Sequence, residues 1–366
     1  MTPPLTVGSA VARPGEIVTG WFDAISLPTG GADRFPVIVA QGRADGPTAW
    51  ITTGIHGDEH TGLLSIHHLI TPDLVYRLRG TLVAVLSLSP AGLRIRKRIP
   101  YYTTDDPNRL FPEPGSDGFG EALGLEGAYR RLFAKIVATR PAFLLDLHNA
   151  WIGSIPFIFR DPVFYGRLGG VSRSRREAEA LQARVGDLVA AFGFTVINEF
   201  VASSYVDRNL HRSVSGAVLN GGGIPAVTVE LGSWMHIDRG VVGACAAGMR
   251  NVLRHAGMLD GDPEPIAGIP LIRPGYPVRR HMHPKAPASG IVQPLVSEGE
   301  SIEAGQPVAR LVDIFGEPVG MDGGLLRTEH SGFVIGMPHG VVRYAGDPVL
   351  GLAIRDDSDL IMPFPE

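Results

Sequence analysis

Short apolar runs rich in β-branched residues recur between about residues 35 and 230, and turn-forming residues bound each of them. They occupy residues 36–40, 49–53, 81–86, 142–147 and 226–230. Continuous apolar runs of this length suit strands that are buried on both faces of a sheet. The pattern therefore predicts a series of buried strands.

Segments with helical spacing of apolar residues lie between these runs, at residues 61–70, 125–139 and 174–192. The last of them opens with Ser174 and, three residues later, Glu177. This spacing predicts a capping box, in which the two side chains satisfy the first free amides of a helix. Strands that alternate with helices predict an α/β sheet with helices on both faces.

The amino-acid composition changes past residue 260, where Pro, Gly and short β-like runs dominate. We therefore expect two domains, residues 1–262 and a small β domain at 263–366. An internal repeat aligns 289–292 and 304–308 with 331–334 and 345–349. It predicts a small pseudo-symmetric β-barrel or sandwich that resembles the barrel-sandwich hybrid of biotinyl and lipoyl carriers. No Lys occurs in the segment 313–329 between the two halves, so a swinging-arm role is not expected.

Composition narrows the class of function. The chain has 366 residues, a net charge of -4 and no apolar run near 18 residues, so we expect neither nucleic acid nor a membrane as partner. No secretory signal is visible, which predicts a cytoplasmic protein. Cys245 is the single cysteine, so any metal must be held by His and carboxylate side chains.

Candidate metal ligands follow two of the predicted strands. His56 and Glu59 lie in a loop at the carboxyl end of one strand, where open α/β sheets bind ligands. His148 ends another and supplies a third ligand, which leaves a position open as in a catalytic zinc site. Asp146 lies two residues before His148, where it either hydrogen-bonds that ligand or only ends the strand in solvent.

A further acid, Glu230, closes the strand predicted at 226–230. Burying a carboxylate is costly, so such a group usually has a partner or a function. Beside a zinc-bound water it would act as the general base. The alternative is a structural carboxylate that pairs with one of the many Arg side chains.

Cationic and amide side chains in a Pro-rich loop are candidates for substrate binding. Asn108 and Arg109 together can hold a carboxylate, because Arg binds it at two points and Asn adds an amide donor. Arg98 lies upstream in a basic cluster that includes Arg94, Arg96 and Lys97. Taken alone, that cluster is typical of a solvated loop.

In their order along the chain, these residues resemble the succinylglutamate desuccinylase/aspartoacylase family, whose members are related to the zinc carboxypeptidases. The resemblance covers about residues 35–235 and rests on four motifs, at 54–59, 106–112, 146–148 and 229–232. In the second motif Pro107 replaces the family's Leu. The resemblance implies a zinc-carboxypeptidase-like mixed sheet flanked by helices, and the part after 265 is similar to the family's C-terminal β domain, which shapes access to the site.

The same resemblance implies roles for individual residues. It implies one zinc ion per chain, bound by His56, Glu59 and His148, with Glu230 as general base. It implies further that Asn108 and Arg109 clamp the substrate α-carboxylate and that Arg98 lies near the developing oxyanion, with Arg96 as the alternative. The expected substrate is a small N-acyl amino acid, cleaved at its amide by metal-activated water.

Other interpretations stay open at this point. A zinc carboxypeptidase acting on short peptides would use the same ligands and clamp, and a non-catalytic homologue would only bind an acylated metabolite. The number of subunits is open, and a homo-oligomer is compatible with the sequence. Of the remaining histidines, His60 lies beside the ligands and His211 falls where the family places substrate contacts. The pair His281 and His283 could bind a metal but is more typical of a surface pair.

Overall fold

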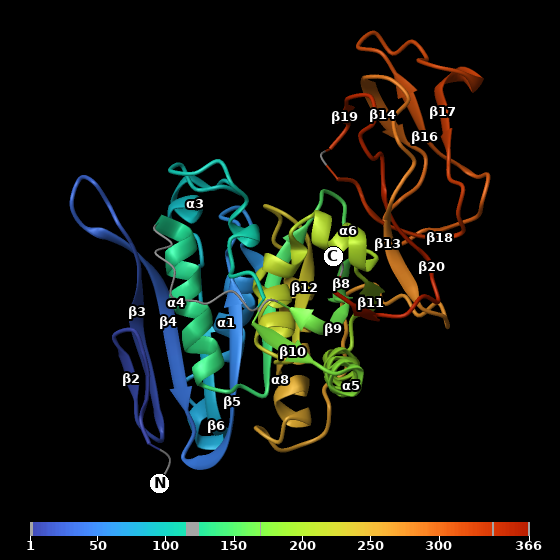
Figure 1. The fold of residues 1–366 in the computed structure, drawn as a ribbon. Helices are drawn as coiled ribbons and strands as arrows, with labels where there is room; N and C mark the ends of the chain where they lie inside the picture. Colours follow the sequence, from blue (N-terminus) through green and yellow to red (C-terminus); the bar gives the residue numbers. More distant parts are fainter. Residues whose placement is uncertain (1–2, 115–123, 169, 339, 365–366) are drawn as a thin grey trace.

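The computed structural model describes residues 3–114, 124–168, 170–338 and 340–364. Its centre is a mixed sheet of 12 strands in the order β15-β18-β20-β13-β11-β8-β12-β7-β5-β6-β4-β3 (Figure 1). Their bounds, in chain order, are β3 (Glu16–Ser26), β4 (Ala32–Gln41), β5 (Ala44–Thr53), β6 (Arg79–Val85), β7 (Phe143–Ala150), β8 (Pro156–Arg160), β11 (Thr195–Asn198), β12 (Ala226–Ser233), β13 (Val278–Met282), β15 (Ser301–Ile302), β18 (Gly332–Gly336) and β20 (Gly351–Arg355).

The middle of this sheet is parallel. Strands β6, β5, β7 and β12 are parallel neighbours, and each has a largely buried apolar sequence. They include four of the five predicted strands, and the fifth lies in β4, which is antiparallel to β6. The mixed sheet expected from the sequence is thus confirmed. Because the parallel strands share a direction, their carboxyl ends meet at one edge, where the candidate residues were predicted to gather.

Helices cover both faces of the sheet. Helices α1 (Thr61–Leu69), α8 (Arg239–His255) and α5 (Arg175–Phe192) form one layer, in which Cys245 of α8 lies within hydrogen-bond contact of Ser65 of α1. Gly62 of α1 packs against Leu147 of β7. The other face carries α4 (Gly124–Ala138) and α7 (Val214–Gly216), where Ser215 Oγ lies 2.8 Å from Thr228 Oγ1 of β12. The capping box of Ser174 and Glu177 at the start of α5 is confirmed.

Short elements complete the chain. The short helices and turns are α2 (Leu74–Arg77), α3 (Pro90–Ile95), α6 (Ala202–Asp207), η1 (Pro107–Arg109), η2 (Leu210–Arg212), η3 (Ala217–Gly221) and η4 (Asp322–Gly324). The remaining strands are β1 (Leu5–Val7), β2 (Ala10–Ala12), β9 (Val163–Leu168), β10 (Val171–Arg173), β14 (Gly290–Pro294), β16 (Pro307–Val312), β17 (Leu325–Arg327), β19 (Val342–Arg343) and β21 (Ile361–Pro363). No helix of the described residues is both long and apolar enough to cross a membrane.

The C-terminal part has its own antiparallel sheet, in the order β17-β16-β14-β19, with a separate apolar core. The predicted repeat is visible as two matching contacts between its halves. The Oγ of Ser331 accepts from the amide of Ala304 at 3.1 Å, and the Oγ of Ser289 accepts from the amide of Ala345 at 3.3 Å. Each half therefore fixes the turn of the other.

The C-terminal part also extends the large sheet. Strand β13 pairs with β11 through Asn198 and Arg279, and β20, β18 and β15 continue from it. Strand β21 returns to pair with β9 beside the larger part (Figure 1). The division at residues 262 and 263 stays a prediction, because it concerns which parts fold as units.

Candidate functional site

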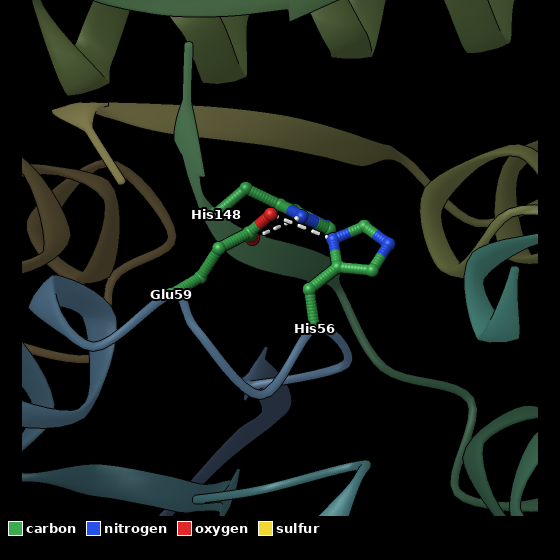
Figure 2. Close-up of side chains that lie close together, drawn as sticks. All are labelled: His56, Glu59 and His148. Carbon is green, nitrogen blue, oxygen red and sulfur yellow. Dashed lines mark hydrogen bonds and ion pairs between the residues drawn. The ribbon is translucent and has the colours of Figure 1, made fainter. Parts of the chain in front are cut away.

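The loop between β5 and α1 carries the first two candidate ligands. Gly54 adopts a φ of +63°, which lets the chain turn sharply as it leaves the strand. At Gly57 a Cβ atom would lie 1.9 Å from the backbone of Gly92 in α3, so only glycine lets the loop pack this closely. This tight turn brings His56 and Glu59 to the same side of the loop (Figure 2).

His148 approaches the same point from the end of β7 (Figure 2). The two carboxylate oxygens of Glu59 lie 2.7 Å from Nδ1 of His56 and 2.9 Å from Nδ1 of His148. Each of the three residues offers one ligand atom, and these atoms lie within 4.8 Å of one another. All three side chains are buried. The structure thus brings the three predicted ligands together.

The outer nitrogens of both imidazoles are held by carboxylates. Nε2 of His56 lies 3.0 Å from Oδ1 of Asp106, and Nε2 of His148 lies 2.7 Å from Oδ2 of Asp146. Asp146 is fully buried and also accepts a hydrogen bond from Thr52 at 2.7 Å. Such partners hold the N–H on Nε2 and turn the Nδ1 lone pair inward, as metal-bound histidines require. Two imidazole nitrogens and one carboxylate fit the ligand set of zinc.

The charges of this cluster favour a cation at its centre. Burial alone would raise the pKa of Glu59, but His56 and His148 hold it well below its ordinary range. Burial alone would lower the pKa of His148, but Asp146 and Glu59 raise it well above its ordinary value. Buried carboxylates on both sides of the imidazoles therefore stabilise positive charge at this point.

Glu230 reaches the same region from β12, where its register partner on β7 is His148. Its Oε2 is buried and has no hydrogen-bond partner among the described residues, and none of the described Arg side chains forms an ion pair with it. The interpretation of Glu230 as an Arg-paired structural carboxylate therefore finds no support in this structure. Burial raises the pKa of Glu230 to about 7. A carboxylate of this pKa is well suited to accept and return a proton near neutral pH.

A cavity of about 130 Å³ opens beside these residues, and Asn108 and Arg109 line its wall. Arg109 donates through Nε to the carbonyl of Arg208 at 2.8 Å and through Nη1 to the carbonyl of Asn108 at 2.7 Å. The Oδ1 of Asn108 accepts from the amide of Val214 at 2.9 Å. These bonds fix the orientation of both side chains, and no described residue accepts a hydrogen bond from Nη2 of Arg109 or from the NH₂ of Asn108, which can serve as donors for a ligand.

Arg98 lies at the rim of the cavity. Its guanidinium is 3.3 Å from Oε1 of Glu59 and 2.9 Å from Oδ2 of Asp106. Arg96, the alternative candidate, is exposed at the end of α3 and does not line the cavity. Of the two arginines, the structure therefore brings Arg98 to the site, while its role near an oxyanion stays a prediction.

Two other predicted neighbours have local partners instead. His60 lies with Nε2 at 3.0 Å from the carbonyl of Gly57, so it stabilises the loop that carries the ligands. His211 is buried and its Nε2 lies 2.9 Å from a carboxylate oxygen of Glu113, outside the residues that line the cavity.

Arg280 is a cavity residue that sequence reasoning missed. It comes from β13, beyond the residues covered by the motifs, and forms an ion pair with Glu199. Its guanidinium packs over the rings of Phe159 and Phe200, 4.7 and 4.1 Å from their centres. No local pattern distinguishes Arg280 from other arginines, since its placement depends on the pairing of β13 with β11. Asp106, by contrast, is part of a motif that had been recognised.

Asp161 is a second missed cavity residue. It is buried and accepts hydrogen bonds from Tyr205 at 2.9 Å and from Ser215 at 3.3 Å. Burial, with the nearby charge of Glu199, raises the pKa of Asp161 to about 7.

We expect Asp161 to make the protein less stable as the pH rises from about 4 to 7. The unfolded chain releases this proton near the ordinary pKa of Asp, whereas the folded protein holds it up to about pH 7. Asp161→Asn should remove this effect and gain roughly 2 to 4 kcal/mol over the wild type at pH 8 but little at pH 4.5. Urea denaturation at both pH values tests this, with exposed Asp207→Asn as control. An equal difference at the two pH values would contradict it.

Comparison with known proteins bears on these residues directly. A model of the succinylglutamate desuccinylase/aspartoacylase catalytic domain matches residues 45–162. This segment contains the ligand loop, the loop of Asn108 and Arg109, and the strand that ends at His148. Residues 45–162 thus match the catalytic domain of the succinylglutamate desuccinylase/aspartoacylase family, and the chain shares its fold with a solved structure that carries this family name. The resemblance noted from the four motifs is confirmed.

Relatives of the family are similar over most of the chain. The N-alpha-acetyl-L-2,4-diaminobutyric acid deacetylase of Halomonas elongata is 23% identical over 286 residues, which are 78% of this chain and 75% of that protein. The crystal structure of a succinylglutamate desuccinylase/aspartoacylase from Rhodobacter sphaeroides has a TM-score of 0.73 at 20% identity, covering 93% of this chain and 96% of that one.

A second similar structure is the product-bound ectoine utilization protein EutE of Ruegeria pomeroyi. Its TM-score is 0.73 at 19% identity, and the alignment covers 96% of this chain and 98% of the other. At this identity the two structures show a common fold. That fold includes the C-terminal sheets, because almost the whole of each chain is aligned.

Proposed function

We propose that this protein is a zinc-dependent hydrolase that cleaves the amide bond of small N-acyl amino acids. The observation that carries the proposal is the buried Oε2 of Glu230, which has no hydrogen-bond partner among the described residues and lies in a cavity with the donors of His56, Glu59 and His148. A family relative whose name describes the deacetylation of an N-acetyl amino acid supports the same reaction class.

His56, Glu59 and His148 would hold the metal through two Nδ1 atoms and a carboxylate oxygen. Zinc in such a set supplies a water of lowered pKa and polarises the carbonyl of the substrate. Asp106 and Asp146 keep the two imidazoles oriented for this role through their hydrogen bonds to Nε2.

Glu230 carries the proton transfers. It accepts a proton from the attacking water as the new C–O bond forms, and it then donates that proton to the amine nitrogen as the C–N bond breaks. The products are a carboxylic acid and a free amino acid. Arg98 lines the cavity, and we infer that it would stabilise negative charge that develops on the carbonyl oxygen.

Asn108 and Arg109 would bind the α-carboxylate of the amino acid. The cavity of about 130 Å³ is smaller than the roughly 300–1,000 Å³ of pockets for drug-sized ligands, which favours a small substrate over a peptide. Arg280 and Glu199 line the same cavity, so the substrate side chain meets both charges there.

A substrate screen with detection of released amine tests the proposed function. Zinc-loaded protein should release amino acid from at least one N-acetyl or N-succinyl amino acid and should act much more slowly on C-terminally free dipeptides. Preferential cleavage of the dipeptides would identify a carboxypeptidase instead. Binding of N-acyl amino acids without turnover would identify a non-catalytic homologue.

We expect this site to hold about one zinc ion and His148→Ala to contain about one ion fewer per chain than the wild type, because that change removes one of three donors. Elemental analysis after dialysis measures the content. His68→Ala is the matched control, since His68 is exposed on α1 away from the cavity. Unchanged metal content in His148→Ala would overturn the assignment of the ligands.

A further inference from the structure

A second group of imidazoles lies in the C-terminal part, away from the cavity described above. His281 is on β13, His283 follows two residues later, and His330 lies in the turn between β17 and β18. The ring centre of His281 is 4.7 Å from that of His330 and 5.4 Å from that of His283, and the third distance is 6.2 Å. None of the three lines the cavity that holds Glu230.

The spacing of these rings is close to that of histidines around one metal ion. A Zn–N bond of about 2.0–2.1 Å puts the centre of each ring about 3.2 Å from the metal, so tetrahedral geometry separates two ring centres by about 5.2 Å. The three observed distances fall on both sides of that value. The three rings come from two segments, the end of β13 and the turn before β18.

Two of the ring nitrogens form no hydrogen bond with a described residue. Nε2 of His281 and Nδ1 of His283 are buried and have no hydrogen-bond partner among the described residues. Burial and the neighbouring imidazole of His330 lower the pKa of both rings, which favours the neutral form that binds metals. A buried polar atom without a partner costs free energy, so a bound ion would relieve two such costs.

The main chain that carries the third ring is held by its own turn. The amide of His330 donates to Oγ1 of Thr328 at 3.1 Å, and this hydroxyl donates back to the carbonyl of His330 at 2.9 Å. Nearby charges of opposite sign, Glu329 and Lys285, act on the cluster, and the Oε1 of Glu329 lies 4.0 Å from Nε2 of His283. Glu329 thus lies at the edge of the cluster, beside the nitrogen of His283 that would not bind the ion.

We propose that His281, His283 and His330 form a second metal site, which binds a divalent transition ion of the zinc and copper class. Imidazole is a preferred ligand of these ions, and the set contains no thiolate that would favour softer ones. Among the described residues, a group of three or more ligand atoms within 4.8 Å of one another occurs only at His56, Glu59 and His148, so the C-terminal rings would turn about their side-chain bonds when the ion binds. The ion would join β13 to the turn before β18, two segments about 50 residues apart.

Zinc titration of the full-length His148→Ala protein tests the second site, because this variant lacks a ligand of the first. Calorimetry should find about one zinc ion per chain. The double variants His148→Ala/His330→Ala and His148→Ala/His281→Ala should bind it at least tenfold more weakly, and His148→Ala/His68→Ala should bind it unchanged. Equal zinc affinity in all four proteins would overturn the proposal.

A second measurement covers the case in which His148→Ala does not fold. Wild-type protein dialysed with zinc should then contain one ion more per chain than His330→Ala, by elemental analysis. Equal content in the two proteins would also overturn the proposal. Deacylase activity is not needed for either measurement, so failure of the proposed function and failure of the second site are distinguishable.

Discussion

Glu230→Gln is expected to lower kcat by about 10²- to 10⁴-fold while the metal content stays unchanged. Gln has nearly the same shape as Glu, but it cannot take the proton from the attacking water. Because Glu230 is not among the three proposed donors, zinc should stay bound. Steady-state kinetics on an N-acyl amino acid and elemental analysis of the same sample measure both results.

The thermal stability of Glu230→Gln distinguishes a role of Glu230 as general base from a purely structural role. Burial raises the pKa of Glu230 to about 7, so above the ordinary pKa of Glu the folded protein bears a cost that the unfolded chain does not. Glu230→Gln removes that cost, and its melting temperature at pH 8 should not fall. Glu126→Gln is the control. Glu126 lies outside the cavity and forms ion pairs with Arg130 and Arg212. If zinc stays bound and turnover changes only a few-fold, the base is another residue.

The buried centre of the fold could be predicted from the sequence, because its strands are buried on both faces and therefore read as apolar runs. The runs at 49–53, 81–86, 142–147 and 226–230 fall in β5, β6, β7 and β12. The helices predicted at 61–70, 125–139 and 174–192 end within a residue or two of α1, α4 and α5. For these strands and helices, local sequence patterns such as the capping box of Ser174 were sufficient for the prediction.

Long-range pairing could not be predicted in the same way. Strand β13 joins the large sheet through one register pair, Asn198 with Arg279. No local sequence pattern predicts such a contact. The continuation of the sheet through β20, β18 and β15 follows from that pairing. The repeat in the C-terminal part could be predicted because its two halves have similar sequences. Ser289 and Ser331 make matching contacts, so the same residue type is required at both positions.

The candidate site also contains residues that local sequence predicts and residues that only long-range pairing brings together. His56, Glu59 and His148 could be predicted because each follows a recognisable strand and the order of the motifs is distinctive. Arg280 and Asp161 could not, because their place in the cavity depends on how distant strands assemble. The ligands thus belong to the part of the fold that local sequence encodes. Arg280 and Asp161, which line the same cavity, belong to the part that it does not encode.

Arg109→Ala is expected to lower kcat/KM for an N-acyl amino acid by about 10- to 200-fold. A charge-assisted hydrogen bond to a carboxylate contributes roughly 1.5 to 3 kcal/mol, which corresponds to this range. Arg109→Lys should recover only part of the loss, since Lys keeps the charge but cannot bind a carboxylate at two points. Exposed Arg184→Ala is the control, because Arg184 is remote from the cavity.

Arg109 also holds main-chain carbonyls of Asn108 and Arg208, so a loss of activity alone would not show what it binds. Replacing the substrate carboxylate by a neutral amide removes the same contact from the other side, and wild-type protein should lose a similar factor. The two changes together should cost little more than either one, because both remove one interaction. If instead the two factors multiply, Arg109 acts only by holding its loop, and the α-carboxylate is bound elsewhere. If the amide is cleaved as fast as the acid, no residue of the cavity recognises that carboxylate, and the assignment of the substrate as an N-acyl amino acid fails.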